Sequence, residues 1–234
     1  LRILRGVRFY ATLGLRPDPA AKEAMIRMAP LLAPVSRERC TQELIRTLMG
    51  EYITEALCGF PAVVGQVVPQ ILPAVGFPQN NRHHIYDVWT HTANSVGLAA
   101  PDPVVRLALL LHDLGKPQCY TEDSRGEGHF YGHALHSARL AEEAIKGLRI
   151  PKKDAAAVLQ LIRHHDDPIP ATLAQVRQSL RKFGPKQFPL LLQVKRADNL
   201  AQNPLYSKQE QLDRAEALLG QVMAEGLCYS VRGL

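Results

Sequence analysis

The sequence predicts an all-α protein, a helical bundle preceded by a smaller helical unit. Apolar residues recur at helical spacing along almost the whole chain, as they do when one face of each helix is buried. Prolines and glycines fall between these segments, where helices begin and end. With 234 residues and 46% hydrophobic content, the chain can bury a substantial core. We therefore expect one main helical domain with an appendage.

The N-terminal unit is predicted from the breaks between its helices. Four helices are expected there, over residues 1–14, 19–28, 36–50 and 51–58. Ser36 is of the type that caps a helix N-terminus and Gly50 of the type that ends one. The next stretch, residues 60–80, contains prolines between apolar residues. It is expected to form a short helix and a turn that join the unit to the bundle.

The main bundle is predicted from longer periodic segments. Its helices are expected near residues 86–98, 103–113, 132–147, 152–165, 172–183, 187–202 and 206–224. Residues 118–131 are polar, contain glycine and lack periodicity. They are expected to form a loop or a small hairpin beside the candidate site described below.

Composition excludes several classes of protein. No apolar stretch approaches the ~18 to 20 residues that a membrane-spanning helix needs, and the N-terminal segment has no signal-peptide core. The four cysteines, Cys40, Cys58, Cys119 and Cys228, show no paired spacing. We expect reduced and mostly buried thiols rather than a disulfide framework. These observations predict a cytoplasmic protein.

The positive charge is concentrated near the N-terminus. The formal net charge is +6, and residues 1–50 hold nine Lys and Arg against four Asp and Glu. Arg2, Arg5 and Arg8 recur at a spacing of three, along one side of the first helix. Such a stripe could contact the phosphate backbone of RNA. The alternative is an ordinary solvated helix face.

A pair of polar residues follows the most apolar helix. His112 and Asp113 come directly after residues 104–111, which contain only one charged side chain. Adjacent helical positions point about 100° apart, so both can reach one ion only at the helix end, where we expect Gly115 to unwind the backbone. His91 and Asp198 are the candidate partners. Nitrogen and oxygen ligands without thiolate predict Mn, Fe, Co, Ni or Zn, with Mg less favoured.

Further histidines cluster near the predicted ends of helices. His133 opens the helix after the polar loop, and His164 and His165 close another. We expect His133 and one or both of His164 and His165 to join the metal site, which could then hold a second ion. No role is assigned to His83, His84 and His129, because nothing in the sequence determines their direction.

This ligand set favours phosphoester hydrolysis by a metal-activated water, with His112 and Asp113 at its centre. Lys116 could contact a phosphate oxygen, or it could be an exposed lysine that interacts favourably with the helix dipole. The sequence contains neither a phosphate-binding P-loop nor a dinucleotide-binding glycine motif nor a serine-hydrolase elbow. Hydrolysis is therefore the best-supported reaction.

The motif His, His-Asp, Asp over about residues 80–202 resembles the HD-domain metal-dependent phosphohydrolases. The segments Arg2-Ile3-Leu4-Arg5-Gly6-Val7-Arg8-Phe9 and Ser36-Arg37-Glu38-Arg39, followed by Glu43-Leu44 and then this motif, resemble bacterial CCA-adding tRNA nucleotidyltransferases of the poly(A) polymerase family. In that family the first segment belongs to the neck after a catalytic head. The head carries a D-x-D pair of aspartates, which this sequence lacks. The resemblance implies an HD-type bundle and a longer parent protein with the head.

The resemblance also implies a division of the chain. Residues 1–58 correspond to the neck, 59–205 to the HD domain, and 206–234 to the start of a truncated C-terminal helical segment. The chain starts with Leu1, within a helical pattern, so we expect a fragment that does not add nucleotides by itself.

Two functions are compatible with this resemblance. In the first, the HD domain hydrolyses 2′,3′-cyclic phosphates, 2′-nucleotides or a phosphorylated RNA end, using one or two divalent ions. In the second, the chain is a non-catalytic tRNA-binding body whose metal site is vestigial or structural. The basic stripe of Arg2, Arg5 and Arg8 favours the second.

Overall fold

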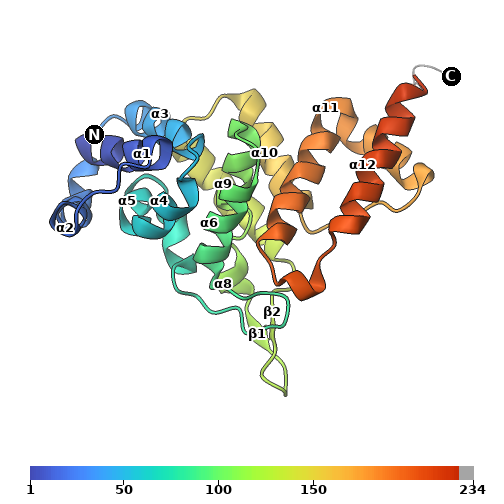
Figure 1. Cartoon of the computed structure of the whole chain (residues 1–234), viewed down its shortest axis with the longest axis horizontal. Helices are drawn as coiled ribbons and strands as arrows, with labels where there is room; N and C mark the ends of the chain where they lie inside the picture. Colours follow the sequence, from blue (N-terminus) through green and yellow to red (C-terminus); the bar gives the residue numbers. More distant parts are fainter. Residues whose placement is uncertain (227–234) are drawn as a thin grey trace.

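The computed structural model describes residues 1–226 and confirms the all-α prediction. The helices form an elongated molecule, with the N-terminal helices at one end and the last two helices at the other (Figure 1). Among the described residues, the regular strands are β1 (Thr121–Glu122) and β2 (Gly128–His129), which pair antiparallel. They form the predicted hairpin, which projects from the middle of the molecule.

The N-terminal unit contains the four predicted helices and one short 3-10 helix. Its elements are α1 (Arg2–Leu13), α2 (Pro19–Arg27), η1 (Ala29–Leu32), α3 (Arg37–Leu48) and α4 (Ile53–Gly59). The Asp18 carboxylate caps α2 by accepting from the backbone N–H of Ala21. Ser36 precedes α3 as predicted, but its hydroxyl contacts Glu38 rather than a backbone amide. Helix boundaries were therefore better predicted than the capping contacts.

The proline-rich stretch joins the two parts of the chain. It forms α5 (Pro61–Val67) and η2 (Pro69–Ala74). α5 packs against α3, α4 and η1, whereas η2 packs against α6, α8 and α9 of the main bundle. The buried apolar residues form a single cluster that extends from Leu4 in α1 to Val222 in the last helix. The two parts consequently share one continuous core.

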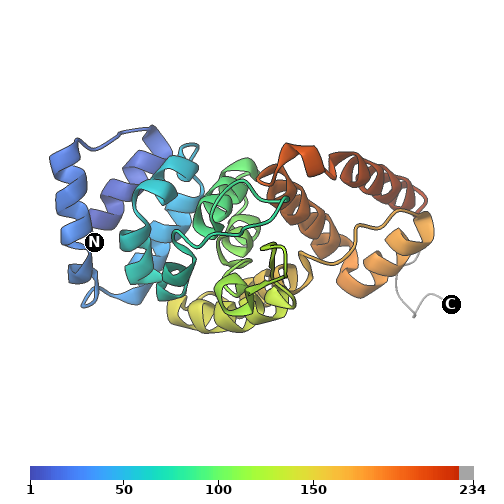
Figure 2. The ribbon, with the colours of Figure 1, turned by 90° about the horizontal axis from the view of Figure 1, so that it is seen from below.

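The main bundle is built around one apolar helix. Its elements are α6 (Val88–Leu98), α7 (Pro103–Leu111), α8 (Lys116–Cys119), α9 (His133–Leu148), α10 (Lys152–His164), α11 (Leu173–Leu200), η3 (Pro204–Tyr206) and α12 (Gln209–Ala224). α7 is surrounded by α3, α6, α9, α10 and α11, which explains why residues 105–111 are all buried. Figure 2 shows the green helices of the bundle between the blue N-terminal helices and the orange and red helices α11 and α12. The short helix α8 was not predicted.

α11 corresponds to two predicted helices. Gly184 interrupts it with φ 80° and ψ 163°, a conformation open to glycine but strained for other residues. Pro185 follows, where the missing N–H is tolerated at the start of a new helical segment. The predicted break between residues 183 and 187 is therefore real.

The structure agrees only in part with the predictions made from composition. In the described part of the chain, Cys40 is buried, Cys58 is exposed and Cys119 is partly exposed, all as free thiols. The expectation of mostly buried cysteines is wrong for Cys58, which lies on the surface of the short helix α4. Cys228 lies outside the described residues. No described helix is long and apolar enough to cross a membrane.

A buried arginine connects the N-terminal unit to the bundle. Arg106 of α7 is only 5% exposed, and its guanidinium donates to the carbonyl oxygens of Leu48, Gly50 and Ala99 at 2.6 to 3.2 Å. Leu48 and Ala99 lie at the C-terminal ends of α3 and α6, where helix dipoles concentrate negative potential. These carbonyl groups stabilise the buried charge in place of a carboxylate.

We expect Arg106→Met to lower the free energy of unfolding by about 3 kcal/mol, because charged hydrogen bonds are lost and buried carbonyls are left unpaired. Urea denaturation followed by circular dichroism measures this change. Arg139→Met replaces an exposed arginine of α9 and should change stability by less than about 0.5 kcal/mol. Equal effects of the two substitutions would contradict the role assigned to Arg106.

Candidate metal centre

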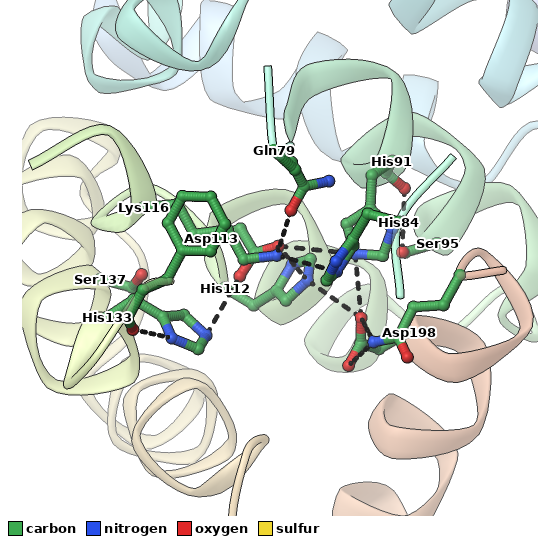
Figure 3. Close-up of polar contacts among 12 residues, drawn as sticks. Gln79, His84, His91, Ser95, His112, Asp113, Lys116, His133, Ser137 and Asp198 are labelled. Atoms are coloured by element: carbon green, nitrogen blue, oxygen red, sulfur yellow. Dashed lines mark hydrogen bonds and ion pairs between the residues drawn. The ribbon is translucent and has the colours of Figure 1, made fainter. Parts of the chain in front are cut away.

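The predicted ligands meet at the middle of the molecule, where the ends of several helices converge. His112 directly follows α7, His91 lies in α6, and Asp198 lies near the end of α11. Nε2 of His91 is 2.9 Å from Asp198 Oδ1 and 3.5 Å from Asp113 Oδ2, and Nε2 of His112 is 3.2 Å from the same Asp113 oxygen. Figure 3 shows these side chains converging on Asp113. The structure thus brings together all four residues of the predicted motif.

Four histidines are oriented in the same way. Each directs its Nδ1 at a backbone carbonyl oxygen; the pairs are His91 with Ala201 at 3.3 Å, His112 with Leu109 at 2.7 Å, His133 with Phe130 at 2.8 Å and His165 with Ile162 at 2.7 Å. A carbonyl oxygen only accepts, so each Nδ1 carries the proton. The Nε2 atoms therefore face the interior of the cluster. This arrangement of a second hydrogen bond behind each ring is typical of metal-binding histidines.

The two oxygens of Asp113 face different pairs of histidines. Oδ2 faces His91 and His112, whereas Oδ1 lies 3.5 Å from His133 Nε2 and 3.8 Å from His165 Nε2. The Nε2 atoms of His133 and His165 are themselves 3.1 Å apart. Two lone pairs at this distance repel each other unless a proton or a metal cation lies between them. The cluster therefore has two adjoining positions suited to a cation, which share Asp113.

The two neighbouring histidines at the end of α10 have different surroundings. His165 is buried and faces the cluster, whereas His164 directs Nδ1 at Asp167 Oδ2, 2.8 Å away, and lies near Lys182. Successive residues of a helix point about 100° apart, so both rings cannot enter the same site. The inclusion of His164 among the predicted ligands is not supported by this geometry, and His165 takes that place.

Lys116 is buried within the cluster. Its ammonium lies 2.7 Å from Asp113 Oδ2, 2.8 Å from Gln79 Oε1 and 3.3 Å from His84 Nε2. The alternative of an exposed lysine at a helix terminus is therefore wrong, because the residue is only 4% exposed. The side chain contributes a positive charge held beside the carboxylate.

Gln79 and His84 are site residues that the sequence analysis missed. Both lie in the irregular segment before α6. Nδ1 of His84 lies 2.9 Å from Asn81 Oδ1, and this contact orients the ring. The only signal was their position shortly before His91. A loop leaves side-chain direction undetermined until the tertiary structure forms, so that signal was too weak to use.

The electrostatics of the cluster depend on burial and on the two carboxylates. Burial would lower the pKa of His112, but the neighbouring Asp113 and Asp198 raise it to about 10, so the ring carries both protons at pH 7 unless Nε2 binds a cation. Burial would raise the pKa of Asp113, but His112 and Lys116 hold it well below its usual range. Burial, together with neighbouring positive groups, lowers the pKa of His165 to about 3 and that of His84 to about 2. Asp113 is thus ionised and His84 and His165 are neutral at pH 7.

The donor atoms fit a divalent ion. His112 Nε2 and Asp113 Oδ1 are fully buried and have no hydrogen-bond partner among the described residues, a costly state for polar atoms unless they bind something. Their surroundings offer imidazole nitrogen and carboxylate oxygen with no thiolate, the set that suits borderline divalent ions. Two groups of three such residues, each containing Asp113, have ligand atoms within 4.8 Å of one another.

The arginines predicted to bind RNA are only partly available. Arg8 and Arg5 of α1 pair with the buried Glu43 of α3, at 2.8 and 3.4 Å, whereas Arg2 is exposed. The predicted stripe is therefore not a uniform face. Because Glu43 is 4% exposed, its charge needs these partners, and their pairing holds α1 against α3.

The architecture and the His, His-Asp, Asp cluster define a class of protein. Residues 83–203 match the HD domain family, and residues 14–58 match a family described as the probable RNA and SrmB-binding site of polymerase A. The chain belongs to the HD domain family. The predicted resemblance is confirmed for both its HD-type region and its neck.

The relatives of the chain are tRNA nucleotidyltransferases. It is 35% identical over 217 residues to a CC-adding tRNA nucleotidyltransferase of Thermus thermophilus, covering 86% of this chain and 49% of that protein. It is 28% identical over 214 residues to an A-adding tRNA nucleotidyltransferase of Deinococcus radiodurans, with coverage of 86% and 49%. The chain thus spans about half the length of these curated relatives.

A solved structure has a similar fold. The Bacillus stearothermophilus CCA-adding enzyme, crystallised in complex with CTP, matches 94% of this chain and 46% of its own, with a TM-score of 0.55 and 20% identity. At this identity the likeness concerns the fold alone. It covers both the N-terminal unit and the bundle.

Gly115 allows the segment after His112 to approach α9. Its φ is −82° and its ψ is −13°, and it lies in the turn between the end of α7 at Leu111 and the start of α8 at Lys116, so the backbone leaves the helix here as expected. A Cβ at this position would lie 2.6 Å from the Ser137 backbone nitrogen and 2.8 Å from the His133 carbonyl oxygen. The glycine is required by this close contact, which sets the distance between Asp113 and His133.

We expect Gly115→Ala to destabilise the protein by about 2 kcal/mol, because overpacking must push α9 away. Gly147→Ala is the matched control: it lies in α9, and its Cβ would meet nothing within 4 Å. The control should be neutral or stabilising by up to about 1 kcal/mol, since alanine favours helix. Thermal denaturation of both variants measures the difference, and a neutral Gly115→Ala would contradict the close-contact argument.

Proposed function

We propose that this chain is a metal-dependent phosphohydrolase acting on nucleotide or RNA phosphoesters, within a tRNA nucleotidyltransferase parent. The observation that carries the proposal is the convergence of four Nε2 atoms on the buried Asp113 and Asp198 carboxylates, with each ring held from behind by a backbone carbonyl. Histidines that are oriented by a second hydrogen bond and that converge on shared carboxylate oxygens are typical of metal sites.

The proposal assigns the ligands as follows. His91, His112, Asp113 and Asp198 hold one divalent ion, and His133 and His165 hold a second, with Asp113 shared between them. The ligand set favours Mn, Fe, Co, Ni or Zn over Mg. His164 remains outside the set because it faces Asp167.

A bound divalent ion supplies Lewis-acid chemistry, lowering the pKa of a water molecule and stabilising negative charge on a phosphate oxygen. The protein holds Lys116 at the same place, as a positive charge that can orient a non-bridging oxygen. Gln79 and His84 accept from its ammonium and so determine its direction. In the net reaction a water oxygen forms a bond to phosphorus, one ester P–O bond breaks, and the departing oxygen takes up a proton.

The proposal also divides the chain by role. Residues 1–58 form the neck, 59–205 the HD domain, and 206–234 the start of a further helical segment, of which residues 227–234 lie outside the described part. Nucleotide addition requires a catalytic head with metal-binding aspartates, which we place elsewhere in the parent protein. The relatives named above, which are about twice as long, support this division.

We expect the purified protein to contain stoichiometric divalent metal and to hydrolyse adenosine 2′,3′-cyclic phosphate. Asp113→Asn should lose most of the metal and reduce kcat/KM at least 100-fold, because it removes the carboxylate shared by both groups of ligands. Asp154→Asn in α10 is the matched control and should retain both properties. Elemental analysis and product chromatography measure the two quantities. A fully active Asp113→Asn variant would refute the assignment.

The neighbouring histidines of α10 test the number of ions. His165→Gln should lower the metal content by up to one ion per chain, whereas His164→Gln should leave it unchanged. The two substitutions have identical chemistry and adjacent positions, and circular dichroism of both variants separates loss of the ion from loss of folding at the buried His165. Unchanged metal content in His165→Gln would restrict the site to the His91, His112, Asp113 and Asp198 group.

The second candidate function is binding of tRNA by a non-catalytic body. It is favoured by the match of residues 14–58 to an RNA-binding family and by the excess of positive charge over residues 1–50. In this case the cluster around Asp113 would be vestigial or would hold a structural ion. The two functions are compatible within one parent protein.

We expect Arg2→Glu to weaken tRNA binding several-fold and to reduce the salt dependence of binding by about one ion. Arg2 is preferable to Arg8, whose removal would take away the shorter of the two ion pairs of the buried Glu43. Arg214→Glu in α12, at the opposite end of the molecule (Figure 1), is the control for net charge. Filter binding over a range of salt concentrations measures both variants, and equal losses would show that no specific contact is made at Arg2.

A further inference from the structure

The metal centre opens into a pocket whose rim has a distinct composition. The pocket has a volume of about 480 Å³, which is in the range of pockets that bind small ligands. Its floor includes Asp113, Lys116 and His133. Two segments of chain supply most of its wall, residues 81–84 and residues 125–133. The second segment contains the strand β2 of the hairpin and the start of α9.

An aromatic pair lies on this rim. The rings of His129 and Tyr131 are stacked, with centroids 5.4 Å apart and an angle of 14° between their planes. Tyr131 is 77% exposed, the highest value for an aromatic residue in the described part of the chain. His129 lies 3.6 Å from Asp123, which supports the ring from within the hairpin. One aromatic ring is thus supported from one side and presented to solvent.

The segment that carries the pair is attached firmly to the site. Phe130, between the two stacked residues, packs against Tyr120 and lies 5.4 Å from the Lys116 ammonium. Gly132 then turns the chain with φ 72°, and His133 follows as a member of the cluster. The exposed tyrosine and the candidate ligand His133 are therefore separated by a single residue.

The same rim carries positive charge. The side chains of Arg82 and Arg125 both line the pocket and are 64% and 82% exposed. Their acidic neighbours are 3.8 and 3.6 Å away, at Glu127 and Asp123 respectively, and such exposed pairs are weak. An exposed aromatic ring and exposed arginines, next to a site suited to a phosphate group, form the combination that recognises nucleotides.

We propose that Tyr131 stacks on the base of a nucleoside phosphoester whose phosphate lies at the Asp113 and Lys116 floor. The ligand is accordingly a nucleotide or nucleotide terminus rather than a base-free phosphoester. The proposal rests on the phosphohydrolase function above and specifies its substrate class. Stacking contributes to binding and leaves the chemical step unchanged, so its signature is in KM rather than in kcat.

The test compares two substrates that differ only in the base, adenosine 2′,3′-cyclic phosphate and methyl riboside 2′,3′-cyclic phosphate. Tyr131→Leu should raise KM for the adenosine ester roughly ten-fold with little change in kcat, and should not affect the base-free ester. Tyr131→Phe, which keeps the aromatic face, should restore the low KM. Tyr86→Leu removes a partly exposed tyrosine that does not line this pocket and serves as the control.

Two results would contradict the stacking role of Tyr131 without contradicting the hydrolysis. One is an equal KM of the unmodified protein for both esters, and the other is an equal effect of Tyr131→Leu on both.

If neither ester is hydrolysed, the phosphohydrolase proposal fails for these substrates, and binding decides the role of Tyr131. Equilibrium dialysis with adenosine 2′-monophosphate should then show roughly ten-fold weaker binding by Tyr131→Leu than by the unmodified protein. Equal binding by the two proteins would refute the stacking role of Tyr131.

Discussion

The burial of Asp113 among histidine Nε2 atoms is the constraint on which the rest of the site depends. A carboxylate that is 2% exposed is costly unless positive charge lies beside it. Lys116 supplies one such charge at 2.7 Å, and the Nε2 atoms of four histidines surround the remaining space. Each of these rings is anchored by a backbone carbonyl at or near a helix end, so the positions of α6, α7, α9, α10 and α11 are all coupled to the geometry around one residue.

Arg106 plays a corresponding role for the architecture. It is a buried cation stabilised by carbonyl oxygens at the ends of α3 and α6, and it emerges from α7, whose C-terminal end carries His112. The helix that presents the candidate ligands is thereby the helix that fastens the N-terminal unit to the bundle. This arrangement gives a physical route by which a neck that contacts RNA and a metal centre would share one rigid element.

The rim of the pocket adds a level of specificity that the cluster alone cannot provide. Histidines and carboxylates around a cation recognise a phosphate group but do not distinguish what is attached to it. Arg125 lies in the hairpin and Tyr131 directly after it, and the hairpin is held to residues 80–82 by contacts that include Gly128 N–H to Asn80 O at 2.8 Å and Arg82 to Glu127 at 3.8 Å. The residues proposed to bind the phosphate and those proposed to select the base thus lie in different elements, and His133 connects the two.

The sequence by itself determined the helical class, most helix positions and the four residues of the central motif. Apolar periodicity indicates which face of a helix is buried. The adjacent His112 and Asp113 after an apolar helix indicate a metal site. Tertiary structure alone decided between His164 and His165, because helical rotation turns only one of them inward. It also decided the burial of Lys116, the recruitment of Gln79 and His84, and the pairing of Arg5 and Arg8 with Glu43. All of these depend on contacts between segments far apart in the chain, which local spacing does not encode.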